Sequence, residues 1–326
     1  MKRLGIARML LVALLSIGAV MLAGMSPARA QMVWKPDRPV TLTVPYSTGG
    51  GTDALARHVA KELAKYWNQS VVVENSPGAD GLVGTRKVIE MKPDGYSLLV
   101  QLPSLTMNRH LPGFKGADPA TQLMPVSVFA SMAGVVVAHA TVPGTTMGEV
   151  VQNCKSSNPP CSFGTTEAVA RLYGQMLALE VPSLIVVNYK GGGQLITDLL
   201  GNNVNMALMG FTAVLPHQQS GKLKIIASIG KKRLPVLPDV PTAAESGFGQ
   251  FTADTWYGLF APLGTPLAVV DGIAVAVKQV VREEAYLKSI AVLGASAVGN
   301  TPTEFAAMVR EENERISDLV RRFPLQ

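Results

Sequence analysis

The sequence predicts an α/β fold of two lobes, each a mainly parallel sheet flanked by helices. Two observations indicate this class. Strand-like and helix-like segments alternate along most of the chain, which is typical of a parallel sheet covered by helices. In addition, 296 of the 326 residues follow a leader-like start, and that length, with abundant apolar side chains, suits two globular domains.

The first 30 residues have the pattern of a secretory signal peptide. A basic start at 2–8 precedes an apolar stretch at 9–25 and a small-residue cleavage site at 28–30. The alternative is a membrane helix, but the apolar run is marginal in length and is interrupted by polar and glycine residues. No cysteine stands directly after this apolar run, so a lipoprotein anchor is not expected. We expect cleavage of residues 1–30 and export to the periplasm.

Removing this leader changes the charge balance. It holds four of the 29 Lys and Arg residues and none of the 23 acidic ones, so the formal net charge falls from +6 to +2. The chain has no basic stripe with interleaved aromatic residues, so nucleic acid is not an expected partner. No later segment is long and apolar enough to span a bilayer.

The expected first lobe begins with a strand at 41–44, a glycine turn and a helix at 54–63. A strand at 70–75, a helix at 81–90 and a strand at 96–100 continue this β-α-β-α-β series. The second lobe is expected to start near residue 126. Its expected strands are 134–138, 162–163, 184–187, 206–209 and 225–228, and its expected helices are 146–154, 167–179 and 194–200.

The C-terminal part contains two predicted helices, at 266–284 and 303–322, after a Pro- and Gly-rich stretch at 234–249. The second opens with a helix-start signal at 301–304. Neither helix brings its own sheet, so both are expected to cover the first lobe, which makes that lobe discontinuous. The expected division is a signal peptide at 1–30, lobe 1 at 31–128 and 253–326, and lobe 2 at 129–252.

A glycine turn joins the first strand to the first helix. Gly49, Gly50 and Gly51 carry no side chains, so backbone N–H groups there can approach a ligand directly. With the positive end of the helix dipole, these groups suit an anion such as a carboxylate. Neither this turn nor a second one at 191–193 has the spacing of a nucleotide-binding loop.

Cys154 and Cys161 are the only cysteines. In an oxidising periplasm we expect a local disulfide that pins a surface loop. No histidine lies near the pair in sequence, so a metal-binding or catalytic role has little support.

Four ordered segments carry a resemblance to a known family. They are 45–53 (PYSTGGGTD), 93–96 (PDGY), 189–201 (YKGGGQLITDLLG) and 237–247 (LPDVPTAAESG) with 255–262 (TWYGLFAP) after it. Together they resemble the Bug-type solute-binding proteins of tripartite tricarboxylate transporters. The resemblance implies a type II periplasmic-binding-protein fold, the Venus-flytrap arrangement. Such a receptor closes over a small organic acid and delivers it to permease subunits in the membrane.

The resemblance also implies where the ligand lies. The loop at 46–52 would hold a ligand carboxylate through backbone amides and ordered water, and the loop at 189–193 would approach from the other lobe. The turn at 164–166 would add hydroxyls and amides. The expected ligand-binding residues are Tyr46, Ser47, Thr48, Gly49, Gly50, Gly51, Thr52, Asp53, Ser104, Gly164, Thr165, Thr166, Glu167, Lys190, Gly191, Gly192, Gly193 and Asp198.

Several of these residues have a structural alternative. Asp53 is better explained as a helix cap, and Asp198 as a residue that orders the second loop. The hydroxyls of Thr165 and Thr166 suit a helix N-cap as well as a ligand. Ser104 is included because ligands of open α/β sheets gather at the carboxyl ends of strands.

The sequence departs from the family pattern in two places. Thr48 stands where a proline is usual, and the turn at 164–168 is less rich in Gly and Ser and contains Glu167. An acidic side chain near an anion site disfavours a highly charged ligand, so we hypothesise that Glu167 selects a monocarboxylate or an acid with an amine or amide. Lys190 is either a partner of a charged ligand or a solvated side chain.

An enzyme is the main alternative from another class. The four histidines are scattered, no nucleophile elbow or H-E-x-x-H motif occurs, and no Cys–His pair suggests itself, so a non-enzymatic receptor without metal or cofactor is expected, as a monomer. A receptor for a membrane sensor kinase would have the same sequence features, whereas a structural envelope protein fits them poorly. Trp256 and Tyr257 are expected in the core or in the cleft wall.

Overall fold

The structure, a computed structural model, describes most of the chain. The signal peptide expected at 1–30 lies outside the described residues, as do Glu167 and Lys190. The described ranges are 34–111, 114–166, 168–189, 191–234 and 236–323.

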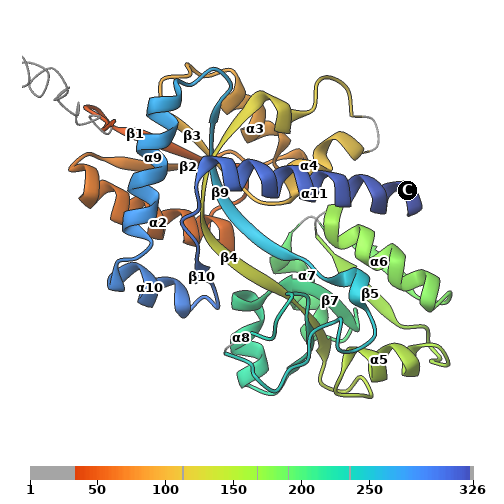
Figure 1. Ribbon diagram of the computed structural model, residues 1–326. Helices are drawn as coiled ribbons and strands as arrows, with labels where there is room; N and C mark the ends of the chain where they lie inside the picture. The colour runs from red at the N-terminus through yellow and green to blue at the C-terminus, as the bar shows by residue number, and fades with distance from the viewer. Residues whose placement is uncertain (1–33, 112–113, 167, 190, 235, 324–326) are drawn as a thin grey trace, which may run out of the picture. The chain divides into compact units, whose positions relative to one another are not determined.

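A first series of strands confirms the β-α-β-α-β prediction. β1 (Val40–Val44) lies between β2 (Val71–Asn75) and β3 (Ser97–Gln101) and is parallel to both. α2 (Gly51–Trp67) follows β1, and α3 (Leu82–Ile89) precedes β3 (Figure 1).

A second series is built in the same way. β5 (Ser162–Thr165) lies between β6 (Ile185–Asn188) and β7 (Met206–Gly210) and is parallel to both. α5 (Met147–Cys154) precedes β5, α6 (Ala168–Glu180) follows β5, and α7 (Gly192–Leu200) follows β6, while β8 (Leu223–Ser228) completes the series. The sequence does not predict α8 (Phe211–Gln219), because its Pro216 is typical of a helix end.

Two long strands, β4 (Leu123–His139) and β9 (Asp254–Pro262), run from the first series into the second (Figure 1). They pair antiparallel with each other along the first part of β4, and from Gly134 onward β4 pairs with β7 and β8. The sequence predicts only 134–138 of this ribbon. Pro125 and two bulges break the period-two alternation by which a strand is recognised.

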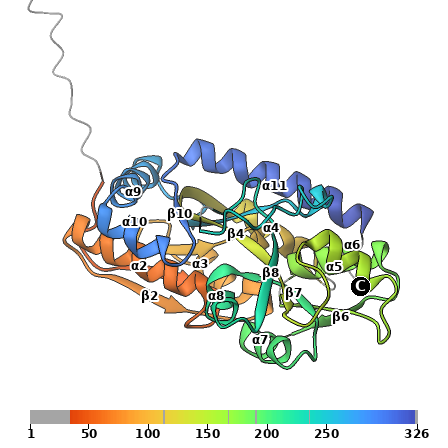
Figure 2. The same ribbon diagram turned by 90° about the horizontal axis from the view of Figure 1, so that it is seen from below.

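The C-terminal helices pack on these strands. α9 (Leu267–Val280) packs on α2 and β4, and a separate α10 (Glu284–Ala291) follows where the sequence predicts the end of one helix. α11 (Pro302–Arg322) begins with a capping box between Thr301 and Glu304, as the helix-start signal predicts. It runs past both series (Figure 2). The remaining short elements are η1 (Ala79–Gly81), α4 (Ser104–Met107), η2 (Asn108–His110), η3 (Pro119–Gln122), η4 (Gly249–Phe251) and β10 (Ser296–Ala297).

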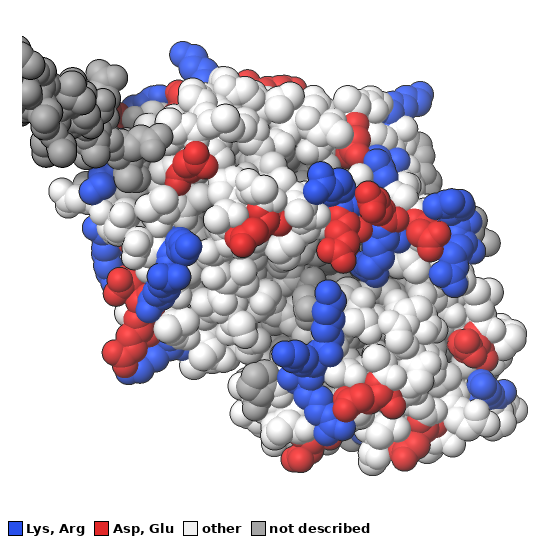
Figure 3. All heavy atoms as spheres, viewed as in Figure 1, with Lys and Arg blue, Asp and Glu red and all other residues white. Residues whose placement is uncertain are grey.

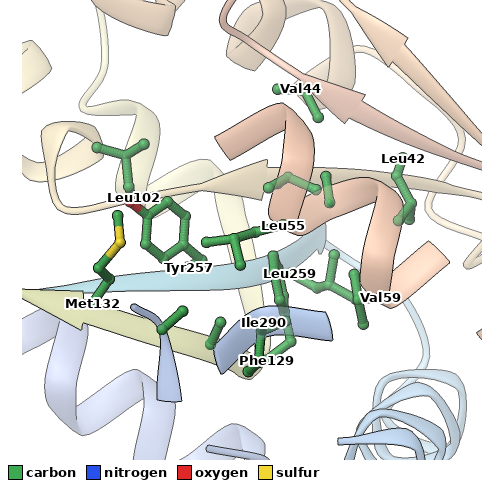
Figure 4. Packing of buried hydrophobic residues seen from close by; sticks show 14 of the residues in the cluster. Leu42, Val44, Leu55, Val59, Leu102, Phe129, Met132, Tyr257, Leu259 and Ile290 are labelled. Carbon is green, nitrogen blue, oxygen red and sulfur yellow. The ribbon is translucent and has the colours of Figure 1, made fainter. Parts of the chain in front are cut away.

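The core of the first series joins α2 and α10 to the sheet. Leu55 and Val59 of α2 lie one turn apart and pack with Leu42, Leu259 and Ile290 in one buried cluster (Figure 4). This spacing places one face of α2 against the sheet, as its amphipathic pattern predicts. Within the described residues, no helix combines the length and the apolar composition that crossing a membrane requires.

The expected disulfide is present. Cys154 at the end of α5 bonds to Cys161 just before β5, and both side chains are buried. The residues between them are mostly exposed, so the two buried cysteines hold the ends of a surface loop together.

Candidate functional site

A cavity of about 290 Å³ lies among elements of both series, the two long strands and α11. Its volume is near the lower end of the range for small-molecule sites, so it suits a ligand of few atoms.

On the face drawn in Figure 3, basic and acidic side chains are interspersed, with no basic stripe on that face.

The first glycine turn contributes one wall. Gly50, Gly51 and Thr52 line the cavity, at the N-terminus of the 17-residue helix α2. Gly50 occupies the N-cap position, and no described side chain caps the helix. The first N–H groups of a helix have no partner within it and carry partial positive charge, so this wall suits an anion.

Asp53 lies behind this wall. Its carboxylate accepts hydrogen bonds from the Gly49 N–H at 2.9 Å and from Asn75 Nδ2 at 3.0 Å, and it pairs with Arg57 at 2.9 Å. Burial raises the pKa of this carboxyl, but the hydrogen bonds from Arg57, Gly49 and Asn75 outweigh it and lower the pKa below its ordinary value. Asp53 therefore stays charged and fixes the turn.

Ser104 is the first residue of α4, directly after the loop that follows β3, and it lines the cavity. The Tyr46 hydroxyl donates to Gln101 Oε1 at 2.8 Å and also contacts the Ser104 hydroxyl. Gln101 in turn donates to the Thr85 hydroxyl at 3.1 Å. This chain of buried and partly buried hydrogen bonds fixes the position of Ser104.

The second series contributes the opposite wall. Gly192, the first residue of α7, and Thr166, which follows β5, line the cavity. Thr165 is fully buried, and its hydroxyl donates to Asn188 Oδ1 at 2.7 Å. A Cβ at Gly164 would collide with Leu195, so this glycine permits close packing between β5 and α7.

The second glycine loop is ordered by a carboxylate. Asp198 accepts a hydrogen bond from the Tyr189 hydroxyl at 2.8 Å and one from Asn203 at 3.3 Å. Burial, together with this bond to Asp198, raises the pKa of Tyr189 to about 12, so the hydroxyl remains a donor at neutral pH. Like α2, α7 has no described side chain as an N-cap.

Comparison with known proteins decides the family. A sequence profile described as "Tripartite tricarboxylate transporter family receptor" matches residues 55–325. The chain belongs to this family. BugT of Bordetella pertussis is 30% identical to this receptor over 291 residues, which cover 88% of this chain and 89% of BugT. The family resemblance predicted from the four segments is therefore confirmed.

Solved structures confirm the two-lobed α/β fold of this receptor. The periplasmic binding protein BugD has a TM-score of 0.79 and 30% identity, with 89% of this chain and 99% of BugD covered. MatC from Rhodopseudomonas palustris, solved with bound malate, has a TM-score of 0.75 and 29% identity, with 87% and 99% covered. The chain is thus a solute-binding receptor of a transport system.

The structure of this receptor brings only some of the predicted site residues to the cavity. Those that line it are Gly50, Gly51, Thr52, Ser104, Thr166 and Gly192. The other described ones are not among the lining residues: Tyr46, Ser47, Thr48, Gly49, Asp53, Gly164, Thr165, Gly191, Gly193 and Asp198.

The sequence does not reveal most of the remaining wall, such as Met132 and Leu208, which lie on strands. Tyr257, which the sequence places in the core or in the cleft wall, belongs to both and lies beside Leu102 and Met132 (Figure 4). The predicted strand at 206–209 could have pointed to Leu208 as a lining residue, because ligands bind at the carboxyl ends of such strands. Trp256, in contrast, packs in the core against Phe305.

Glu312 and Arg315 of α11 are the charged residues of the wall within the described ranges. Arg315 donates through Nε and Nη2 to the two carboxylate oxygens of Glu312, at 3.0 and 2.8 Å. Its Nη1 donates to the Tyr173 hydroxyl at 3.4 Å. Burial would lower the pKa of Arg315, but the bonds with Glu312 and Tyr173 raise it, so the guanidinium stays charged. The described residues contain no cluster of three or more potential metal ligands.

Proposed function

We propose that this receptor binds a small organic carboxylate in the cavity, with the carboxylate held by backbone N–H groups of Gly51 and Thr52 and by the amide of Gly192. One observation carries the proposal: two helix N-termini without a described side-chain cap, those of α2 and α7, open onto the same cavity. Such termini are suited to bind anions. The relative MatC was solved with malate, which is a carboxylate.

The other described positions of the predicted site support it from outside the residues that line the cavity. Residues 46–49 and Asp53 shape the first turn, and Gly164, Thr165, Gly191 and Gly193 shape the opposite side, where Asp198 orders the loop. In this proposal Glu167 still selects against highly charged acids. An unchanged ligand profile of Glu167→Ser in calorimetry would remove that role.

Capture depends on movement of two lobes, with lobe 1 formed by 31–128 and 253–326 and lobe 2 by 129–252. Two features support this division: β4 changes its pairing partner at Gly134, and β9 begins at Asp254. A ligand that contacts both lobes only when they are shut shifts the population to the closed form.

The closed receptor delivers its ligand to the membrane permease of a tripartite transporter. Residues 1–30 direct it to the periplasm as a cleaved signal peptide, and it acts as a monomer without catalysis. The same closed form is suited to a sensor kinase. Pull-down of the membrane partner distinguishes a permease from a sensor kinase. Mass spectrometry tests for catalysis, because a receptor releases its bound acid unaltered.

The test is calorimetry and thermal unfolding of the mature chain with a panel of small carboxylates and their alcohol analogues. We expect an acid to raise the melting temperature while its alcohol does not, because a ligand of the folded state stabilises it. Failure of every acid in the panel would reject the proposal.

A matched pair of variants ties the binding to the glycine turn. Gly50 has φ −75°, which any residue adopts, so Gly50→Val adds a side chain at the wall without backbone strain. We expect its affinity to fall at least about tenfold. Gly249, which has open space around it, provides the control Gly249→Val, with unchanged affinity expected.

A further inference from the structure

Apolar side chains form much of the cavity wall. Met132, Val169 and Leu208 contribute them from β4, α6 and β7, and Ile229 contributes one directly after β8. These groups offer no partner to a charge, and an unpaired charge is costly to remove from water. This part of the cavity therefore suits the hydrocarbon body of an acid.

The ion pair on α11 determines which group is available to a second carboxylate at the other end of such an acid. Arg315 alone would suit that carboxylate, since its planar guanidinium group can donate to both carboxylate oxygens. Glu312 already occupies these donors, because it accepts hydrogen bonds from both Nε and Nη2 of Arg315. The two side chains are only 15% and 29% exposed, so the pair is held within the wall.

Within the described residues, the wall carries one positive and one negative charge, which bind each other. This part of the wall therefore offers no free cation to a second ligand carboxylate. A second carboxylate would have to displace Glu312 or lie beside it, and like charges repel in a poorly hydrated cavity.

We propose that Glu312 occupies the guanidinium donors of Arg315 so that the receptor prefers an acid with one carboxylate and an apolar body over the dicarboxylate of the same length. This inference rests on the proposed function, because the single carboxylate is the one held at the helix N-termini. It assigns Glu312 a role as a specificity-determining residue.

The experiment compares matched acids in calorimetry at neutral pH with the mature receptor. The pairs are butyrate with succinate, hexanoate with adipate, octanoate with suberate, and 4-methylbenzoate with terephthalate. In the best-binding pair, we expect the wild type to favour the monocarboxylate at least about tenfold. Tighter binding of the dicarboxylate would overturn the inference while the proposed function stood. If no acid bound, the proposed function itself would fail.

The decisive variant is Glu312→Gln, which keeps the side-chain shape and frees the charge of Arg315. We expect the ratio of the two affinities to move at least about tenfold toward the dicarboxylate. Because both acids are measured on the same variant, a partial loss of folded protein does not change the ratio. An unchanged ratio would show that Glu312 does not set the preference.

Two further variants sharpen the result. Glu314→Gln removes an exposed carboxylate from the same helix and should leave the ratio as in the wild type. The double variant Glu312→Gln with Arg315→Gln removes the freed cation, so we expect the gain in dicarboxylate binding to disappear. Persistence of the gain in the double variant would contradict the role of Arg315.

Discussion

Asp53 shows how a single carboxylate can support a binding site without touching a ligand. It is 3% exposed, and it holds the Gly49 N–H, Arg57 and Asn75 around the start of α2. Loss of a buried, charged hydrogen-bond acceptor leaves its donors unsatisfied. The carboxylate is therefore expected to stabilise both the fold and the first turn.

We predict that Asp53→Asn lowers the free energy of unfolding by about 1–3 kcal/mol at neutral pH. The folded-state pKa is lowered, so the contribution is complete above the unfolded value near 4 and is lost as the pH falls through the folded value. The difference in the free energy of unfolding between wild type and variant should thus become smaller in acid. Urea unfolding at neutral pH and at about pH 3 measures it, with exposed Asp271→Asn as the control. A gap that does not narrow would contradict the prediction.

Individual residues also show what the sequence can predict about the site. The strand-end rule leads to Ser104, and the glycine pattern leads to Gly50 and Gly192, all of which line the cavity. A linear motif does not tell which of its residues line a cavity: Ser47 belongs to the same motif as Gly50, but it is exposed and does not line the cavity. Arg315 could not be predicted, because an i, i+3 Glu–Arg pair on a helix is usually solvated.

At the scale of elements, the disulfide links the end of α5 to β5 and closes a short loop. We predict that the double variant Cys154→Ala, Cys161→Ala unfolds with a free energy about 2 kcal/mol lower, chiefly because the unfolded chain gains freedom. Neither cysteine lines the cavity, so the affinity for the acid identified in the calorimetric panel should not change. Denaturant unfolding and calorimetry test the two parts, and a large loss of affinity would mean that the loop acts on the site.

The elements that the sequence predicts well are those whose pattern is local. α2, α5 and α11 have a clear apolar face and recognisable starts, and β1 is a short apolar run before a turn. β9 is not predicted, because its pairing with β4 is a long-range contact. The sheet order that brings β9 between β3 and β4 likewise depends on contacts between distant segments.

At the scale of the whole receptor, more than the two long strands connects the series. Phe305 near the start of α11 packs against Trp256 and Phe260, whereas Ile316 and Leu319 near its end share a cluster with residues of α5 and α6. α11 therefore contacts both sides of the cavity. Any closing motion must keep it fixed to one side and shift its packing on the other, which limits the path that the proposed lobes can take.

An ion pair also joins the two series beside the cavity. Arg171 of α6 donates to Asp80 of η1 at 3.0 Å, and their side chains are 26% and 23% exposed. Asp80 has φ 51°, in the left-handed region, where Asn is also tolerated. Asp80→Asn thus removes the charge without adding backbone strain.

We predict that Asp80→Asn weakens binding of that acid several-fold, because the pair stabilises the arrangement in which α6 and η1 lie together. A ligand that needs this arrangement binds less tightly when the arrangement is less populated. Calorimetry measures the affinity, and X-ray scattering of the ligand-free receptor should show a larger radius of gyration. Lys87→Gln breaks an ion pair with Glu74 inside the first series and should change neither quantity. Equal affinity and equal scattering for Asp80→Asn and wild type would show that the pair does not control closure.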